Sequence, residues 1–272
     1  MKIISKNSAM KRLSALIVVL VIASIVQAHE FWLQPAKFRF ALGETIKLDF
    51  MVGESFTGEF WDLNKHKAEK MELHRLGGVR DLAKDVKPTQ GNNLFFKADQ
   101  EGTYLFSLQS NAAYIELEGE KFNDYLKEDG LDYILDERTK AGSLNKKSTE
   151  FYSRFAKVLV QAGNKTDDTY KKKLGLRYEI IPDQNPYTLK AGDHLQCRVL
   201  FEGKPAAHAL VKVWNKVNNT TFLQNIYTEN DGTMRFPISA SGPWMVSSVK
   251  MIHSEKEGAE YHSLWASLVF GI

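Results

Sequence analysis

The sequence predicts a mainly β protein in which two β regions are separated by a helical segment. Residues 37–53 alternate apolar and polar side chains around a turn, as a half-buried hairpin does. Apolar residues recur at helical spacing between residues 113 and 163. Beyond residue 176, short strand-like runs bounded by Pro and Gly return every ~8–12 residues, which is typical of a β-sandwich. We therefore expect a signal peptide at 1–28, an N-terminal antiparallel β domain at 29–112, a helical insertion at 113–175 and a C-terminal β-sandwich at 176–272.

The first 28 residues have the pattern of a secretory signal peptide. Four basic residues precede the apolar run at 13–26, and Val26 and Ala28 occupy the two positions that a signal peptidase inspects. The apolar run is shorter than the ~20 residues of a membrane span. We expect cleavage after Ala28, export to the periplasm, and no transmembrane segment in the mature chain. The alternative is a retained N-terminal anchor, which would leave residue 29 without a free amine.

Charge and cysteine content argue against a nucleic-acid-binding protein and against a protein stabilised by disulfide bonds. Removal of the signal peptide takes away four basic residues and no acidic ones, so the formal net charge changes from +3 to −1. A near-neutral chain gives no electrostatic reason to expect a nucleic-acid partner. Cys197 is the single cysteine, so no intramolecular disulfide forms. It lies in the alternating run HLQCRVLF, where a small buried strand residue is expected.

In the N-terminal β region the pattern predicts two hairpins joined by a long connection. The first is KFRFALGETIKLDFMVG, with its turn at Leu42 and Gly43. The second is NNLFFKADQEGTYLFSLQS, with its turn at Asp99-Gln100-Glu101-Gly102. Residues 57–90 between them are rich in Lys, Gly and Asp, and we expect an irregular connection there.

The middle segment predicts a helical hairpin. Phe122, Tyr125 and Leu126 have helical spacing, and Gly130 is placed to end that helix. Asp132 begins a second short helix that runs to about Lys140. A third helix is predicted within residues 143–163, where four apolar residues fall on one helical face. They are Phe151, Phe155, Val158 and Leu159.

The C-terminal region resembles a known type of small sandwich. Its strands are separated by turns at Asn230-Asp231-Gly232 and at Gly242-Pro243. The order GKPAAHALVKVW, then T-x-x-D-G-x-x-x-F-x-I, then GPWMV resembles the prealbumin or carboxypeptidase-regulatory modules. This resemblance implies a β-sandwich fold and does not determine function.

The whole mature chain also resembles a family of exported domains of unknown function. The landmarks, in order, are AHEFW, YIELEGEKFNDYLKEDGL, FAKVLVQAG, YEIIPDQNPYTLKAGDHLQCRVLFEGKPAAHALVKVW and GPWMVSSVKM followed by SLWASLVF. This family is often labelled nickel-uptake-associated, or a nickel and cobalt transporter accessory component. The resemblance implies an exported accessory that works with an inner-membrane or outer-membrane metal transporter. Tyr261 and His262 stand where the family usually has a Trp and an acidic or amide residue, a difference that either creates a metal ligand or is drift.

Cleavage after Ala28 would make His29 the first residue, and that position suits metal binding. The α-amine and ring Nδ1 of an N-terminal histidine close a chelate ring on one ion, and one further imidazole completes a T-shaped N3 set. Such a set suits Ni²⁺ or Cu²⁺, and Co²⁺ is also a candidate ion. His262, beside the last strand, and His253, in the polar loop before it, are the expected partners. The alternative is that His29 only happens to follow the cleavage site.

Two other functions stay open from the sequence. The first is a non-catalytic β-sandwich module that binds a protein or a glycan, in which tryptophans form a stacking platform rather than core anchors. The second is a histidine-brace copper oxidase that acts on polysaccharide. The sequence holds no Gly-rich phosphate loop, no G-x-S-x-G elbow and no nucleophile–histidine arrangement that it supports by itself, so no enzyme is expected.

Overall fold

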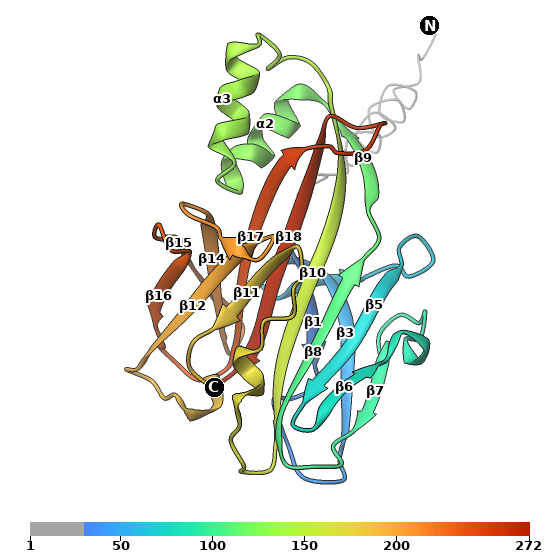
Figure 1. Cartoon of the computed structure of the whole chain (residues 1–272), viewed down its shortest axis with the longest axis vertical. Coiled ribbons are helices and arrows are strands. Elements are labelled where there is room, and N and C mark those ends of the chain that lie inside the picture. Colours follow the sequence, from blue (N-terminus) through green and yellow to red (C-terminus); the bar gives the residue numbers. More distant parts are fainter. Residues whose placement is uncertain (1–29) are drawn as a thin grey trace, which may run out of the picture.

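The computed structural model describes residues 30–272, which form three layers of β-sheet with two helices at one end (Figure 1). The predicted signal peptide and His29 lie outside the described residues. The central layer is a ten-stranded sheet whose main path runs β15-β14-β17-β18-β10-β8-β5-β6. Its strands are β2 (Arg39–Phe40), β5 (Ala68–Arg75), β6 (Gly78–Asp81), β8 (Gly102–Ser110), β9 (Ala113–Leu117), β10 (Ser148–Ala162), β14 (Leu210–Val217), β15 (Thr220–Tyr227), β17 (Pro243–His253) and β18 (Tyr261–Gly271).

Two four-stranded sheets form the outer layers. The first, here called the β1 sheet, consists of β1 (Glu30–Pro35), β3 (Thr45–Glu54), β4 (Thr57–Phe60) and β7 (Leu94–Lys97). The second, the β12 sheet, consists of β11 (Tyr178–Pro182), β12 (His194–Phe201), β13 (Lys204–Pro205) and β16 (Thr233–Pro237). Short 3₁₀ turns occur at Ala83–Asp85, Asp168–Lys171 and Pro186–Thr188.

Each face of the central sheet packs against one outer sheet. On β18, Leu264 and Leu268 belong to the core shared with the β12 sheet. Val269, on the opposite face of the strand, belongs to the core shared with the β1 sheet. All 11 residues of β18 are therefore buried. A strand that is covered on both faces loses the apolar–polar alternation that marks a half-buried strand.

The pairing of β10 with β18 joins the two β regions into one sheet. The two strands run parallel, from Glu150 opposite Tyr261 to Val158 opposite Val269. The central sheet thus takes strands from both sides of the middle segment. The domain boundaries expected at residues 112 and 175 stay predictions.

The third predicted helix is wrong, because residues 148–162 form β10, a strand of 15 residues. Phe155 and Leu159 face the core of the β12 sheet, whereas Val158 faces the core of the β1 sheet. The helical spacing arose because both faces of the strand are apolar. Within the segment 113–175, the helices occupy only residues 119–140.

The other two helices and the mainly β fold are confirmed. α2 (Gly119–Glu128) and α3 (Asp132–Lys140) pack on the upper end of the central sheet (Figure 1). Phe122, Tyr125 and Leu126 are buried against the sheet, as their spacing predicts. Gly130 ends α2 with φ +66°, a conformation that glycine adopts at low cost.

The turns of the N-terminal region are correctly predicted, but the pairings across them are wrong. β2 pairs with β10 in the central sheet, whereas β3 pairs with β1, β4 and β7. β7 and β8, on either side of the second turn, also lie in different sheets. Residues 57–90 are not an irregular connection, since they contain β4, β5 and β6. In the C-terminal region, strands follow both predicted turns, and Cys197 is buried on β12 as expected.

Candidate functional site

The structure does not bring His262 and His253 together. His253 pairs with Tyr261 across β17 and β18, and His262 pairs with Ile252. Directly paired residues share a face and successive residues alternate, so the two imidazoles lie on opposite faces of the sheet. His262 is buried, with Nε2 3.0 Å from the Ser153 hydroxyl.

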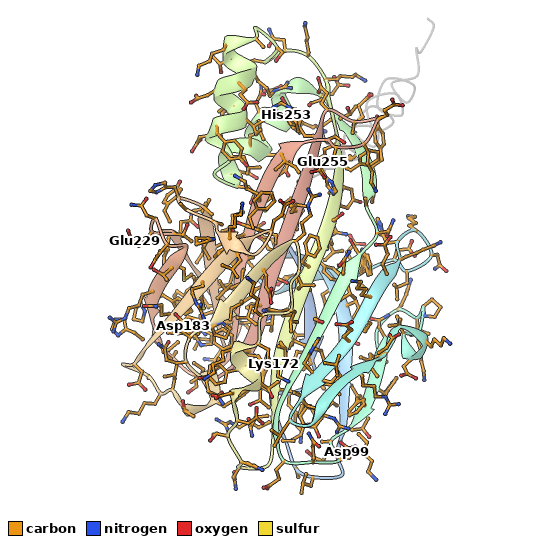
Figure 2. All side chains as sticks on the ribbon, viewed as in Figure 1. Asp99, Lys172, Asp183, Glu229, His253 and Glu255 are labelled. Atoms are coloured by element: carbon orange, nitrogen blue, oxygen red, sulfur yellow. The ribbon has the colours of Figure 1, made fainter. Side chains whose placement is uncertain are left out.

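His253 is exposed beside the helices (Figure 2), and its Nε2 lies 2.9 Å from Glu137 Oε2. The hydrogen bond that connects β1 to β18 lies further along β18, where the Ser267 hydroxyl donates to the Phe31 carbonyl at 2.7 Å. Six residues of strand separate Ser267 from Tyr261, a distance of about 20 Å. The ring of His262 lies on the face of β18 that bears Leu264 and Leu268, whereas Ser267 lies on the face that contacts β1.

A cluster of aromatic rings lies instead beside the beginning of β1. The ring centroids of Phe31 and Trp61 are 4.8 Å apart. Trp61 stacks on His66, with centroids 5.4 Å apart and ring planes inclined by 7°. Tyr152 of β10 lies 6.2 Å from His66. The guanidinium of Arg154 lies over both Phe31, at 5.5 Å, and Tyr152, at 5.0 Å. We call these five residues the ring cluster.

His66 is held in the ring cluster by stacking rather than by hydrogen bonds to its ring. Within residues 30–272, neither ring nitrogen has a hydrogen-bond partner, whereas the backbone N–H of His66 donates to the Asp62 carbonyl at 3.0 Å. Partial burial, together with the charge of Arg154, lowers the pKa of His66 below its ordinary value. His66 is therefore a neutral imidazole near pH 7, which is the form that binds metals.

Arg154 is a cation without a carboxylate partner. No acidic side chain of residues 30–272 forms an ion pair with it, and its buried Nε has no hydrogen-bond partner among them. Burial lowers the pKa of Arg154 to about 10. The aromatic faces beneath the guanidinium provide its stabilisation.

The other side of β1 carries an acidic cluster. Glu30 Oε1 lies 3.5 Å from Lys212 Nζ, and Asp129 Oδ1 lies 2.7 Å from the same ammonium. Both carboxyl groups are buried, and burial raises the pKa of Glu30 to about 7 and raises that of Asp129. Because both buried carboxyl groups contact the ammonium of Lys212, these ion pairs connect β1, β14 and the end of α2.

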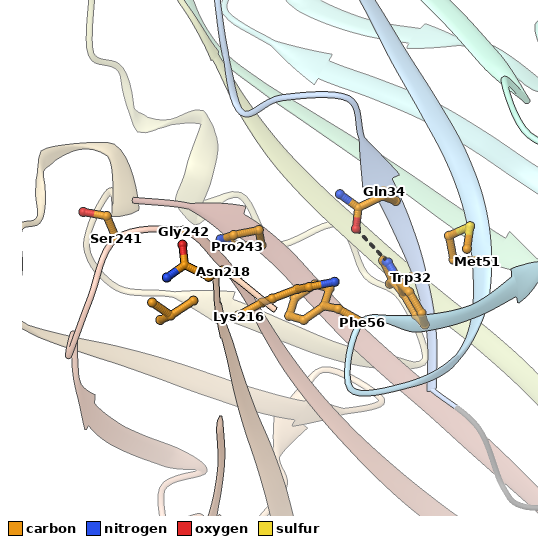
Figure 3. Close-up of a pocket in the computed structure, with 10 residues that line it drawn as sticks. Trp32, Gln34, Met51, Phe56, Lys216, Asn218, Ser241, Gly242 and Pro243 are labelled. Atoms are coloured by element: carbon orange, nitrogen blue, oxygen red, sulfur yellow. Dashed lines mark hydrogen bonds between the residues drawn. The ribbon is translucent and has the colours of Figure 1, made fainter. Parts of the chain in front are cut away.

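A cleft of about 590 Å³ opens between the β1 sheet and the C-terminal strands (Figure 3). Trp32 and Phe56 are its aromatic lining, and Trp32 Nε1 donates to Gln34 Oε1 at 3.0 Å. Lys216 and Asn218 line the opposite side. Ser55 and Phe56, which form the β3–β4 turn, both have positive φ. That conformation is costly for a phenylalanine, and such backbone strain is frequent at binding sites.

Residues 30–272 contain no group of three or more His, Cys, Asp or Glu side chains that could hold a metal ion. Any site that uses His29 involves a residue outside this range. The sequence pointed to His262 and His253 because they flank the last strand. His66 lies in a Lys-rich loop with no metal-ligand spacing, so no sequence pattern singles it out.

The fold is that of a mainly β protein of layered sheets with a helical insertion, and its sequence matches a family model. A family model described as Domain of unknown function (DUF4198) matches residues 26–251, so the chain belongs to that family. No curated protein matches the chain. Within residues 30–272, no helix has the length and apolar character of a membrane span.

Two solved structures are similar to the chain at low identity. A marsupial T cell receptor is 7% identical, with a TM-score of 0.23, and the match covers 88% of this chain and 73% of the receptor chain. The three N-terminal domains of the highly immunogenic outer capsid protein of bacteriophage RB49 are 12% identical, with a TM-score of 0.20. That match covers 89% of this chain and 59% of the phage chain. Scores this low carry no functional argument.

Proposed function

We propose that this protein is an exported periplasmic accessory that binds nickel or cobalt through His29 and passes the ion to an inner-membrane or outer-membrane transporter. Copper(II) is the third candidate ion, because an amine and an imidazole on one residue suit its square geometry. The family is one of unknown function, so membership in it specifies neither the location of the protein nor an ion. The proposal therefore depends on the geometry at the beginning of β1.

The supporting observation is that β1 is held firmly from its first residue. Glu30 already pairs with Gly53 and is buried, and the Phe31 carbonyl accepts a hydrogen bond from Ser267. A peptide bond fixes consecutive Cα atoms 3.8 Å apart. A metal ion bound at residue 29 would therefore lie next to a strand that is already fixed, and a site supported by a rigid element binds more tightly than one on a mobile segment.

The test is isothermal titration calorimetry of tag-free protein that begins at His29, with Ni²⁺, Co²⁺ and Cu²⁺ in turn. A variant with one alanine added before His29 is the matched control, because it keeps the imidazole and removes the chelating amine. We expect the added alanine to weaken binding roughly tenfold or more, which is about 1.4 kcal/mol. Affinity should increase from pH 6.5 to 8.5, since the amine, with a pKa of about 7.7–8.0, must lose a proton. Equal affinity of the two proteins would refute the proposal.

A second candidate function, a glycan-binding module, is favoured by the cleft in Figure 3. Its aromatic lining, its amide side chains and the single ammonium of Lys216 are the groups that recognise amphipathic polar ligands. Titration of neutral and acidic oligosaccharides, followed by tryptophan fluorescence, tests it. A glycan site requires saturable quenching that Asn218→Ala and Lys216→Ala weaken. Copper-dependent release of oxidised oligosaccharides would instead support a copper oxidase.

A further inference from the structure

We propose that two copies of this chain associate through β15, edge to edge, so that their central sheets join into one continuous sheet. The surface is the free edge of β15, together with its exposed apolar side chains Phe222, Leu223 and Tyr227. The occupant is the same strand of a second copy, which runs antiparallel to the first about a two-fold axis. This inference does not depend on the proposed metal or glycan binding.

The first argument is that β15 has an unpaired edge. It ends the main path of the central sheet on the side away from β6 (Figure 1), and among residues 30–272 only β14 pairs with it. Just beyond β15, the Thr228 N–H donates to the Ala209 carbonyl at 3.0 Å. Bonded positions alternate along an antiparallel ladder, so the even-numbered residues of β15 bond to β14. The N–H and C=O groups of the odd-numbered residues from 221 to 227 therefore point outward.

The second argument is that β15 lacks the features that usually protect an edge strand. Proteins protect sheet edges with short strands, charged side chains, Pro or bulges. The opposite edge of the same sheet follows this rule, because β6 has only four residues and two of them are Arg80 and Asp81. β15 has eight residues, TTFLQNIY, without a charge, a Pro or a Gly. Its apolar side chains are open to solvent, since Phe222 is 56% exposed, Leu223 44% and Tyr227 55%.

The third argument is that β15 is complementary to itself in one register. A two-fold axis at Gln224 sets Leu223 opposite Asn225 of the second copy, and Thr221 opposite Tyr227 of the second copy. All four outward-directed residues of each copy are then paired with each other. Each of these four pairs exchanges two backbone hydrogen bonds, which makes eight. Moving the axis by one residue to either side leaves only three such pairs.

The same register brings apolar side chains together on both faces of the joined sheet. On one face, Phe222 lies opposite Ile226 of the second copy in a non-hydrogen-bonded pair, where side chains approach most closely. On the other face, Leu223 is the diagonal neighbour of Leu223 and Tyr227 of the second copy. Because β15 is uncharged, no like charges meet across the contact. The chemistry of the strand therefore suits a second copy of itself.

The size of the contact predicts a weak dimer. An eight-residue edge buries less than the ~1,200–2,000 Å² of a standard interface. We therefore expect a dissociation constant on the order of 10–100 µM, so that the proportion of dimer depends on protein concentration.

The first experiment is sedimentation velocity of the tag-free protein over a range of concentrations. Leu223→Lys places two ammonium groups next to each other at the axis. The matched control is Val79→Lys, which puts the same charge on the exposed edge strand β6. We expect the unmodified protein and Val79→Lys to dimerise equally, and Leu223→Lys to weaken dimerisation tenfold or more. Circular dichroism and thermal melting confirm that both variants are folded.

Two results of sedimentation would overturn the proposal. One is a protein that stays monomeric at millimolar concentration, which would leave the edge to a strand of a different protein. The other is a dimer that Leu223→Lys weakens no more than Val79→Lys does, because such a dimer would use another surface.

The second experiment tests the register by disulfide cross-linking. Gln224→Cys sets two cysteines directly opposite each other, with Cβ atoms about 4.5–5.5 Å apart, and we expect an intermolecular disulfide under mild oxidation. Phe222→Cys is the matched control, since about 14 Å of strand separates it from its copy, too far for a disulfide. The unmodified protein gives the background, because its Cys197 is buried. Cross-linking of Phe222→Cys as readily as Gln224→Cys, or of neither, would overturn this pairing.

Discussion

Lys157 of β10 and Glu179 of β11 form an ion pair in the interior, with 3.0 Å between Nζ and Oε1 and only 1% of each side chain exposed. The pair connects the central sheet to the β12 sheet. Glu179 also accepts hydrogen bonds from the backbone N–H groups of Leu174 and Gly175, at 2.8 and 3.0 Å. The carboxylate is thus fully engaged, whereas desolvation lowers the pKa of the Lys157 ammonium.

Removal of one partner of this pair should cost more stability than removal of both. Lys157→Met leaves an uncompensated buried carboxylate, and we expect it to lower the free energy of unfolding by about 3–5 kcal/mol. The double variant Lys157→Met/Glu179→Gln should recover most of this loss, because no buried charge remains. Urea unfolding of the two single variants and the double variant gives the coupling energy. Additive losses would show that the two side chains act independently.

Gly130 should tolerate no side chain, because α2 closes against β14 at this residue. Its φ is +66°, and a Cβ atom there would lie 2.6 Å from the Leu210 Cβ. Gly142 has φ +61° with no atom within 4 Å of the corresponding position. Gly142→Ala should therefore cost only the backbone strain, about 1 kcal/mol, and Gly130→Ala should cost clearly more.

Thermal melting of the two glycine variants checks this difference, since the backbone conformations match and only the contact with Leu210 differs. Equal melting temperatures would mean that the helices can shift away from β14 without loss of stability.

Glu150 should make the protein less stable as the pH rises. Its side chain is buried on β10 beneath α2, Oε1 accepts a hydrogen bond from Ser263 at 3.2 Å, and burial raises its pKa to about 8. The folded state therefore holds the proton more tightly than the unfolded state, whose pKa is near 4.5. The penalty is absent below about pH 4.5, grows between 4.5 and 8, and is complete above 8.

Glu150→Gln should remove this penalty, so the variant should be more resistant to urea than the unmodified protein at pH 9 and similar to it at pH 5. The exposed Glu59→Gln is the matched control and should behave as the unmodified protein at both pH values. A Glu150→Gln variant that lost stability with pH as steeply as the unmodified protein would contradict the assignment.

Arg154 should oppose protonation of His66. Its guanidinium lies in the ring cluster and is one cause of the lowered pKa of His66. Arg154→Met keeps an apolar side chain against Phe31 and Tyr152 but removes the charge. We expect the pKa of His66 to rise in an NMR titration, because one cause of its lowering is removed. An unchanged His66 titration would show that burial alone sets its pKa.

The sequence by itself determined the local structure of the two helices and of the turns. The spacing of Phe122, Tyr125 and Leu126, with Gly130 after them, predicted α2, and turn residues such as Gly232 and Gly242 marked reversals between strands. Helical spacing and turn chemistry act within a few residues, so they can be recognised without knowing the rest of the fold.

Only the tertiary structure decided which strands pair and which side chains meet. The apolar spacing of β10 resembles that of a helix because two different sheets bury its two faces. Its parallel partner β18 is more than a hundred residues away in the sequence. For the same reason the sequence could not predict the ring cluster. The stacking of His66 on Trp61 beside Phe31 arises when the loop before β5 folds back against β1.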